Sequence, residues 1–348
     1  MTSKSRAEND NGMATPRARV IIDNDFSGDP DGLFQLVHHV LSPSVEIPFA
    51  IGSHLSPDDP FDSSSRQADN AVKVAKEILS LLGLERQPPV LLGSNVGLSS
   101  PIEPIRTEAA EAIVAEAMRE DTDLPLYVAL GAGLTELASA HLIEPRIAER
   151  LTAVWIGGAE PEGVAVGPKG PRGIEYNLNI DVTAGQVIFN NSQIPIWQVP
   201  RNVYRQCLVS RAELHSRVKP MGRIGARLIE AIDQVFDGAE KVGLLMGETY
   251  ALGDSPLVLL TALQSSFEPD SSSSFHSTVP TPRINPDGSY GANPDGRPMR
   301  QYTHVDNRLM FEDFYHKIAA FAAENPDRQI ATGRDDSLHR ARGTVRSD

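Results

Sequence analysis

Residues 20–33 read Val-Ile-Ile-Asp-Asn-Asp-Phe-Ser-Gly-Asp-Pro-Asp-Gly-Leu, an apolar run that leads into four aspartates, Asp23, Asp25, Asp29 and Asp31. Three consecutive β-branched residues are typical of a buried strand, and the acidic residues begin where that strand ends. Gly28 and Pro30 predict an irregular loop, and the apolar positions from Leu33 onward recur at helical spacing. Because ligands of open α/β sheets bind beyond the carboxyl ends of strands, this junction predicts a binding site.

Two interpretations of the aspartate cluster remain open on these residues alone. Like charges within ~4–6 Å raise one another's pKa, so a bound cation would compensate their crowding. An all-oxygen set suits calcium or magnesium better than zinc, although the spacing and the missing closing Glu do not fit an EF-hand. Alternatively, Asp residues with Gly and Pro are common in turns, and Asp is a favoured helix N-cap.

The composition of the chain limits its class. Its 348 residues, of which 40% are hydrophobic, suffice for one large α/β domain or two smaller ones. A net charge of −14 disfavours nucleic acid and anionic membranes as partners, and no stretch approaches the ~20 apolar residues of a membrane helix. The single cysteine, Cys207, excludes an intramolecular disulfide. The polar first nineteen residues carry no secretory signal, so we expect a cytoplasmic protein.

Strand-like and helical patterns alternate along the chain, which predicts an open, mostly parallel α/β sheet with helices on both faces. After the first strand, we expect further strands at 45–51, 89–92, 126–130, 151–156 and 194–199. Helices are expected at 68–82, 108–119, 134–141, 181–189 and 308–323, and mostly helical structure at 211–258. Residues 160–174 read as a loop, and 265–300 as loop with a late edge strand. We expect a disordered arm at 1–17, a single domain at 18–325 and a disordered tail at 326–348.

Polar residues recur where the predicted strands end. They are His54, Gly131-Ala132-Gly133, Glu175-Tyr176-Asn177 and Gly253-Asp254. If the strands are parallel, these residues meet at one edge of the sheet, where carboxylates and amides suit a neutral polyol. No Gly-Lys-Ser/Thr ending follows the glycines, which disfavours a phosphate loop, and their spacing does not fit a dinucleotide fingerprint.

Five segments in order make the chain resemble the inosine–uridine preferring nucleoside hydrolase family, from about Arg19 to Phe321. The first is Asp23-Asn24-Asp25 with the acidic loop that follows. The others are Gly131-Ala132-Gly133-Leu134-Thr135-Glu136-Leu137-Ala138, Trp155-Ile156-Gly157-Gly158-Ala159, Glu175-Tyr176-Asn177 with Asp181, and Gly253-Asp254-Ser255-Pro256-Leu257. Five ordered segments are far more specific than any one of them. The resemblance implies an open α/β fold and a calcium ion at the bottom of the pocket.

In that family the calcium binds the ribose 2′- and 3′-hydroxyls and a water that attacks the anomeric carbon. The resemblance implies that Asp25 is a calcium ligand and accepts the proton of the water, with Asp23 supporting it from behind. The carbonyl of Gly131 matches a backbone calcium ligand. Asp254 matches the late aspartate that holds both calcium and ribose.

The resemblance also implies contacts to the sugar. Glu175 and Asn177 match the pair that grips the ribose hydroxyls, and His54 takes the place of an asparagine that touches ribose in other members. The family's usual acidic pair is two adjacent aspartates, whereas this chain aligns Asp31-Gly32 there. Asp29 and Asp31 together are therefore expected to serve as metal ligand and ribose contact, the alternative being that one of them is a helix N-cap.

A second departure concerns the leaving group. Many nucleoside hydrolases place a histidine before the late aspartate, where it protonates the departing base, and this chain has Gly253. Other candidates for the acid are Tyr250, Arg201, Tyr204 and Arg205. Trp155 and Trp197 are candidates for stacking on a purine, although both lie in strand-like runs typical of the core.

Taken together, the residues and the resemblance predict a calcium-dependent hydrolase that cleaves the N-glycosidic bond of ribonucleosides, giving ribose and free base. Clamped hydroxyls and nearby carboxylates suit the oxocarbenium character of that reaction. One alternative is a hydrolase of another ribosylated metabolite on the same fold, and a second is an inactive nucleoside- or sugar-binding relic. Family members are usually oligomers, so a homodimer or homotetramer is implied. The preferred base and the leaving-group acid stay open.

Overall fold

A computed structural model describes residues 15–161, 173–265 and 273–326. The predicted arm at 1–17 lies outside the described residues except for 15–17, and the predicted tail at 326–348 except for 326. Most of the loop predicted at 160–174 also lies outside them.

The core of the molecule is an open sheet in the order β10-β13-β7-β6-β5-β1-β3-β4, with β2 also paired to β1. Its strands are β1 (Ala18–Asn24), β2 (Val45–Glu46), β3 (Ala50–Gly52), β4 (Val90–Leu92), β5 (Leu126–Leu130), β6 (Leu151–Ile156), β7 (Ile196–Val199), β10 (Phe275–Pro280) and β13 (Pro298–His304). Among the described pairings of this sheet, only edge strand β10 runs antiparallel to its neighbour. The predicted open, mostly parallel sheet is confirmed.

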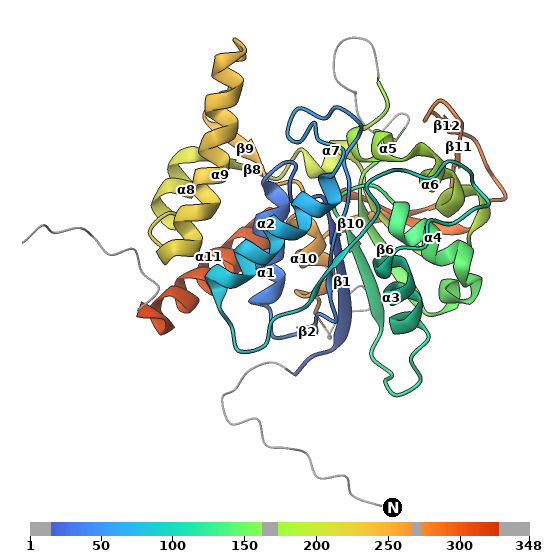
Figure 1. Ribbon diagram of the computed structural model, residues 1–348, viewed down its shortest axis with the longest axis horizontal. Helices are drawn as coiled ribbons and strands as arrows, with labels where there is room; N and C mark the ends of the chain where they lie inside the picture. The colour runs from blue at the N-terminus through green and yellow to red at the C-terminus, as the bar shows by residue number, and fades with distance from the viewer. Residues whose placement is uncertain (1–14, 162–172, 266–272, 327–348) are drawn as a thin grey trace, which may run out of the picture.

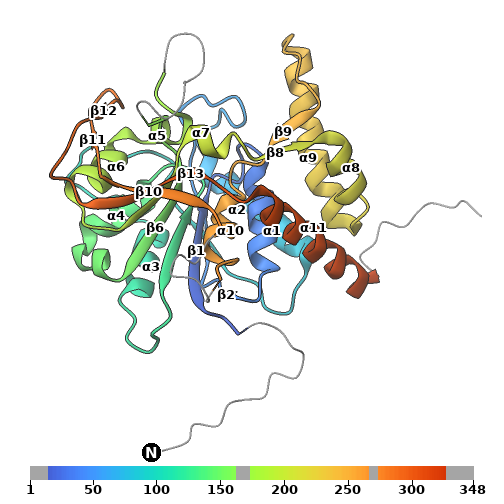
Figure 2. The same cartoon turned by 180° about the vertical axis from the view of Figure 1, so that it is seen from behind.

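Helices cover both faces of this sheet (Figures 1 and 2). They are α1 (Asp31–Val40), α2 (Gln67–Leu82), α3 (Glu108–Ala117), α4 (Thr135–Ile143), α5 (Tyr176–Ile180), α6 (Val182–Gln186), α7 (Arg201–Tyr204), α8 (Arg211–Arg217), α9 (Gly222–Lys241), α10 (Pro256–Thr261) and α11 (Asn307–Glu324), with a 3₁₀ turn η1 (Pro145–Glu149) and a π turn η2 (Val187–Asn191). Two small antiparallel pairs add β8 (Leu208–Ser210) to β9 (Thr249–Ala251) and β11 (Arg283–Ile284) to β12 (Tyr290–Gly291).

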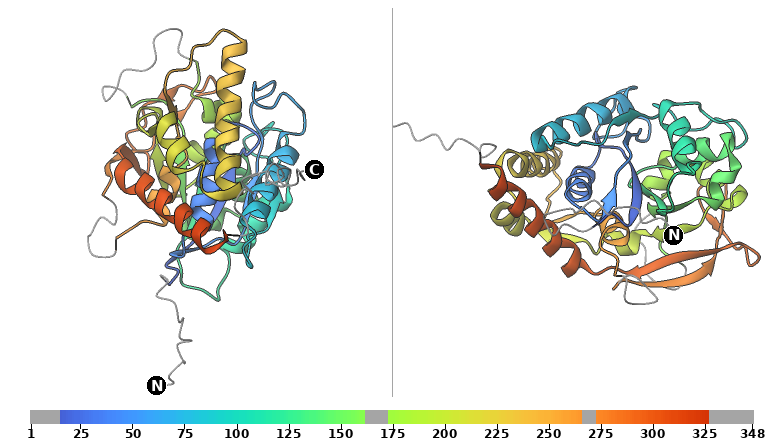
Figure 3. Two further views of the ribbon diagram at one scale, coloured as in Figure 1. Left: turned by 90° about the vertical axis from the view of Figure 1, so that its left-hand side faces the viewer. Right: turned by 90° about the horizontal axis from the view of Figure 1, so that it is seen from below.

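The side chains of β1 point alternately to the two faces of the sheet, and both faces are buried. Val20 and Ile22 pack into one apolar cluster with α1, α2, α9, α10 and α11, whereas Ile21 packs into a second cluster with α3, α4 and η2. The view from below separates these two helical layers (Figure 3). A strand covered on both faces is mostly apolar, so the run of polar residues that starts at Asp23 marks the carboxyl end of β1.

Several predicted elements differ in their bounds. The strand predicted at 45–51 is two short strands, β2 and β3, because Pro48 between them has no N–H to donate to a neighbour. The helix predicted at 181–189 starts only after Asp181, which caps it, and continues as the π turn η2. Within 211–258 the strand β9 interrupts the helices. By contrast, α2 ends as its pattern predicts, at Gly83 with a left-handed φ of 52°.

The carboxyl ends of the parallel strands lie at one edge of the sheet. The loop after β3, the short helices α5 and α7 and the far end of α9 lie at this same end of the molecule (Figure 1). No helix within the described residues has the length and apolar character needed to cross a membrane.

Candidate active site

Three neighbouring strands bring the predicted site residues together. Asp23 of β1 is paired with Leu130 of β5, which in turn is paired with Trp155 of β6. The N–H of Gly131 donates to the carbonyl of Asp23 at 3.0 Å, so the glycine segment after β5 lies against the acidic segment after β1. Residues more than 100 positions apart therefore share one edge of the sheet.

A cavity of about 170 Å³ lies at this edge. Its lining consists of Asp25, Asp29, Asp31, Phe61, Gly131, Ile156, Glu175, Tyr176, Asn177, Tyr204, Gly253 and Asp254. Seven of the nine residues predicted for the site are among them, namely Asp25, Asp29, Asp31, Gly131, Glu175, Asn177 and Asp254. The structure thus gathers the expected metal and sugar residues around one space, while Asp23 and His54 lie outside its lining.

The four aspartates of the cavity are held by few donors. Asp29 Oδ1 accepts from the Tyr250 hydroxyl at 2.8 Å and from the Asp31 N–H at 3.2 Å. Asp31 Oδ2 accepts from the Asp254 N–H at 3.2 Å, and Asp254 Oδ2 accepts from Asn24 Nδ2 at 2.8 Å. These contacts tie the loop after β1 directly to the segment before α10, which is why the acidic residues converge.

Burial and mutual repulsion make these carboxylates hard to ionise. Burial raises the pKa of Asp25 and of Asp31 well above the usual value, and the neighbouring Asp254 and Asp29 raise both further. Burial likewise raises the pKa of Asp254 to about 7 and raises that of Asp29. A cation bound among them would reverse this effect, because it favours the ionised carboxylates.

The donor set fits a hard divalent ion. Three carboxylates of the loop after β1, the carboxylate of Asp254 and the carbonyl of Gly131 all border the cavity, and all of them offer oxygen. Within the described residues no group of three or more His, Cys, Asp or Glu side chains is already arranged to hold an ion. The fit therefore rests on the donor chemistry and on the crowded charge.

The opposite wall of the cavity carries the residues expected to hold a sugar. Asn177 donates from Nδ2 to the carbonyls of Gly131 at 3.0 Å and Ile156 at 2.7 Å. Glu175 caps α5, because its Oε2 accepts from the N–H groups of Leu178 at 3.1 Å and Gly158 at 2.6 Å. Both side chains are buried and locked by the backbone, so they present the same polar atoms to any ligand.

Asp23 and His54 belong to a buried polar network behind the cavity. Asp23 Oδ1 accepts from Ser53 at 2.7 Å, and burial raises its pKa to about 7. His54 bonds through Nδ1 to the carbonyl of Leu55 and through Nε2 to Thr135, each at 2.9 Å. The structure therefore does not bring His54 into the cavity as a ribose contact, because both ring nitrogens are engaged elsewhere. The support of Asp25 by Asp23 stays a prediction.

The four candidates for the leaving-group acid differ in whether they line the cavity. Tyr204 lines the cavity, and its hydroxyl donates to Glu175 Oε1 at 2.8 Å. Tyr250 donates to Asp29, and Arg201 pairs with Glu160 at 2.7 and 2.5 Å. Arg201, Arg205 and Tyr250 are not in the lining of the cavity.

The tryptophans considered for stacking are structural. Trp155 is buried, and its Nε1 donates to the carbonyl of Ala132 at 3.0 Å. Trp197 packs on Tyr127 and under the guanidinium of Arg300. Neither lines the cavity, so neither is placed to stack on a substrate there.

Sequence reasoning missed Phe61, Tyr176 and Asp59. Phe61 and Tyr176 line the cavity, and the Tyr176 hydroxyl donates to Asp59 Oδ2 at 2.7 Å. Asp59 is buried, and its charge contributes to the raised pKa values of Asp25 and Asp29. Tyr176 stands between Glu175 and Asn177 in the sequence, and this position could have identified it as a residue of the site. Asp59 and Phe61 lie in an irregular loop after β3, where no periodic pattern marks them.

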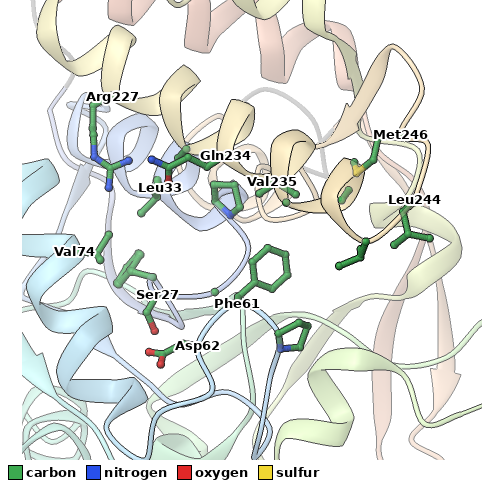
Figure 4. Close-up of a pocket in the computed structure, with 18 residues that line it drawn as sticks. Ser27, Leu33, Phe61, Asp62, Val74, Arg227, Gln234, Val235, Leu244 and Met246 are labelled. Atoms are coloured by element: carbon green, nitrogen blue, oxygen red, sulfur yellow. The ribbon is translucent and has the colours of Figure 1, made fainter.

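A larger groove of about 750 Å³ adjoins the cavity through Phe61. Figure 4 shows Phe61 in this groove, near Gln234 and Val235 of α9, with Leu244 and Met246 at one side. The groove is mostly apolar and none of the site carboxylates lines it. The chemistry is therefore assigned to the smaller cavity, and the groove to its surroundings.

The comparisons agree with this geometry. The profile of the family described as inosine-uridine preferring nucleoside hydrolase matches residues 20–308. The chain therefore belongs to the inosine-uridine preferring nucleoside hydrolase family. It is accordingly an enzyme of the N-ribosyl hydrolase class. A search of curated proteins finds no match.

Solved structures share the fold at low sequence identity. A purine-preferring ribonucleoside hydrolase from Gardnerella vaginalis superposes with a TM-score of 0.66 at 18% identity, covering 87% of this chain and 99% of the other. An inosine-uridine preferring nucleoside hydrolase from Bacillus anthracis gives 0.61 at 14%, with coverages of 87% and 99%. A plant nucleoside hydrolase gives 0.62 at 16%, with coverages of 88% and 100%. These likenesses support the fold.

Proposed function

We propose that this protein hydrolyses the N-glycosidic bond of ribonucleosides to ribose and free base, and that it depends on calcium. The observation that carries the proposal is the single cavity in which Asp25, Asp29, Asp31 and Asp254 face Glu175 and Asn177. Four carboxylates on one wall and a carboxylate–amide pair on the other suit a ligand that combines hydroxyls with a developing positive charge.

Asp25 is the proposed proton acceptor. Its carboxylate is buried and lines the cavity, and a bound cation would keep it ionised, which is the form that accepts a proton. It takes a proton from the attacking water at a carboxylate oxygen. The remaining carboxylates stabilise positive charge that develops on the sugar as the C–N bond lengthens.

Glu175 and Asn177 are the proposed sugar clamp. Because hydrogen bonds to the backbone fix both side chains, ribose hydroxyls would meet prepositioned acceptors, and the anomeric carbon would be held for attack. Calcium would be held by Asp25, Asp29, Asp31, Asp254 and the carbonyl of Gly131. When bound, the ion supplies Lewis acidity that helps to deprotonate water and orient the ribose hydroxyls.

A hydrolase of another ribosylated metabolite remains the second candidate, because Gly253 offers no proton to a departing base. A homodimer or homotetramer and a cytoplasmic location are further proposals, which membership of the family supports. The inactive relic is disfavoured by the complete set of cavity carboxylates.

The test measures free ribose released from inosine, uridine, adenosine, guanosine and cytidine, with calcium and after chelation. Asp25→Asn should lower the rate by about 10²–10⁴-fold, the usual worth of a general base. The matched control is Asp123→Asn, an exposed aspartate before β5 at the opposite edge of the sheet, which should leave the rate unchanged. Absence of ribose release from every nucleoside, in protein that binds calcium, would overturn the nucleoside assignment.

A further inference from the structure

The charge of the cavity exceeds what a divalent ion can offset. Five carboxylates line it, from Asp25, Asp29, Asp31, Glu175 and Asp254, and no Lys, Arg or His is found among its described lining residues. A bound calcium ion favours the ionised carboxylates, and its two positive charges would offset two of the five negative charges when all five are ionised. The cavity therefore keeps a negative field even with the ion in place, and a low-dielectric surrounding strengthens that field.

Asp59 adds a sixth carboxylate beside this lining. It is buried, and its charge acts on both Asp25 and Asp29. The nearby guanidinium of Arg201 does not compensate, because Glu160 engages it through two hydrogen bonds. The balance of charge around the ligand space is thus negative from several directions.

Aromatic rings share the lining with these carboxylates. Phe61, Tyr176 and Tyr204 border the cavity and come from three separate segments of the chain. Aromatic faces attract cations, and cages of aromatic and acidic side chains are the usual means of binding a cationic nitrogen. Carboxylates alone would suit the metal, but the added rings indicate an organic cation.

The phenol hydrogens of Tyr204 and Tyr176 are both donated to carboxylates. Tyr204 donates its hydroxyl hydrogen to Glu175 at 2.8 Å, and Tyr176 donates its own to Asp59 at 2.7 Å. A Cβ added to Gly253 would lie 3.2 Å from Asp31 Oδ2 and 3.5 Å from the ring of Tyr204. Because Gly253 has no side chain, the Asp31 carboxylate and the Tyr204 ring remain open to the cavity at this position, and position 253 supplies no side-chain proton donor.

We infer that the preferred substrates are ribosides whose glycosidic nitrogen belongs to a cationic aromatic ring, of the N-ribosylpyridinium class. This inference rests on the proposed function and names its substrate class. The cationic ring lies against the aromatic side chains, and its charge is balanced by carboxylates that the metal leaves uncompensated. A neutral nucleoside gains less from the same surroundings.

The chemistry of such a substrate needs no leaving-group acid. The C1′–N bond breaks with its electron pair remaining on the ring nitrogen, which cancels the positive charge, and the heteroarene leaves neutral. The oxygen of water bonds to C1′, and the proton that it loses passes to the Asp25 carboxylate and then to solvent. A neutral nucleoside would instead release an anionic base or require a proton at that base, and the hydrogens of these two phenols are already donated to Glu175 and Asp59.

The kinetic test compares kcat/KM for 1-(β-D-ribofuranosyl)pyridinium with that for inosine and uridine, in the calcium-loaded enzyme. We expect kcat/KM to be higher for the pyridinium riboside than for inosine and uridine. This ratio of kcat/KM values should exceed the ratio of the uncatalysed hydrolysis rates by about tenfold, the worth of one cation–π contact. Gly253→His should raise kcat/KM for inosine and uridine, because it supplies an acid, and should leave the pyridinium riboside unimproved.

The binding test needs no turnover. Two uncleavable C-ribosides of matched shape, N-methyl-4-ribosylpyridinium and 4-ribosyltoluene, differ in charge alone, and calorimetry gives their dissociation constants. We expect about tenfold tighter binding of the cationic probe. Asp59→Asn should weaken the cationic probe and leave the neutral one unchanged. The control, Asp62→Asn, alters the same loop at a residue that lines the groove and should change neither.

The outcomes separate the two proposals. Hydrolysis of inosine or uridine with equal binding of both probes would overturn the cationic class and leave the nucleoside hydrolase intact. Hydrolysis of the pyridinium riboside alone, with tighter binding of the cationic probe, would support the inference. Absence of hydrolysis of every riboside would overturn the proposed function itself and this inference with it.

Discussion

The stability of the calcium-free protein should fall as the pH rises toward neutrality. Burial raises the pKa of Asp254 from 3.8 to about 7, so the folded state keeps a proton that the unfolded chain has already lost. Stability falls with pH wherever the folded state binds more protons, at about 1.4 kcal/mol per pH unit and group. This one carboxyl then costs about 2 kcal/mol between about pH 5.5 and pH 7. The pKa values of Asp25 and Asp31 are also raised well above the usual value and act in the same direction.

Calcium should reverse this trend, because the ion binds the ionised carboxylates and favours them in the folded state. The assay is urea unfolding across this pH range, in calcium-depleted protein and in millimolar calcium. The stabilisation by calcium should grow with pH. In the Asp254→Asn variant this side chain cannot ionise. The slope of the unfolding free energy against pH should therefore be smaller in the calcium-free variant by about 1.4 kcal/mol per pH unit. Equal slopes in the variant and the parent would refute the reasoning, since the slope would then arise elsewhere.

Three further substitutions test the contacts around the cavity. Gly131→Ala would drive a methyl group into Asp254 Oδ2, and should lower the free energy of unfolding in urea by at least about 2 kcal/mol. The control is Gly238→Ala, at an exposed helical position with open space around it, which should leave the free energy of unfolding unchanged or raise it. Tyr250→Phe removes a hydrogen bond to the partly buried carboxylate of Asp29 and should cost about 1.5–3 kcal/mol near pH 8, and an unchanged unfolding midpoint would contradict this. Asn177→Asp replaces a donor to two carbonyls by an acceptor, and should lower kcat/KM about 10²-fold or more; retention of the parent rate would exclude this role.

The sheet and the acidic wall of the cavity could be predicted because their signals are local. The run Val20-Ile21-Ile22 followed by acid marks a strand buried on both faces and its carboxyl end, and the structure has that strand at Ala18–Asn24. The strands predicted at 126–130 and 151–156 coincide with β5 and β6. Parallel pairing then places their ends side by side, so residues far apart in the sequence could be assigned to one site before any coordinates.

The contribution of the loop after β3 could not be predicted, because it depends on where an irregular segment folds. Asp59 and Phe61 follow β3 in a segment without periodicity, and their place beside the cavity is set by a bond from Tyr176, 117 residues away. His54 shows the opposite failure. It stands at the end of a strand as expected, but its ring turns to Leu55 and Thr135, an orientation that sequence position cannot reveal.

Two buried amides connect these walls, and they explain why position 131 is glycine. Asn24 donates to Asp254 from one side of Gly131, and Asn177 donates to the carbonyl of Gly131 from the other. A side chain at 131 would collide with the amide of Asn24, so only glycine lets the carboxylate wall and the sugar wall approach this closely. The spacing between metal and sugar ligands is therefore set by backbone and amide contacts, and it should persist when the charges of the carboxylates change.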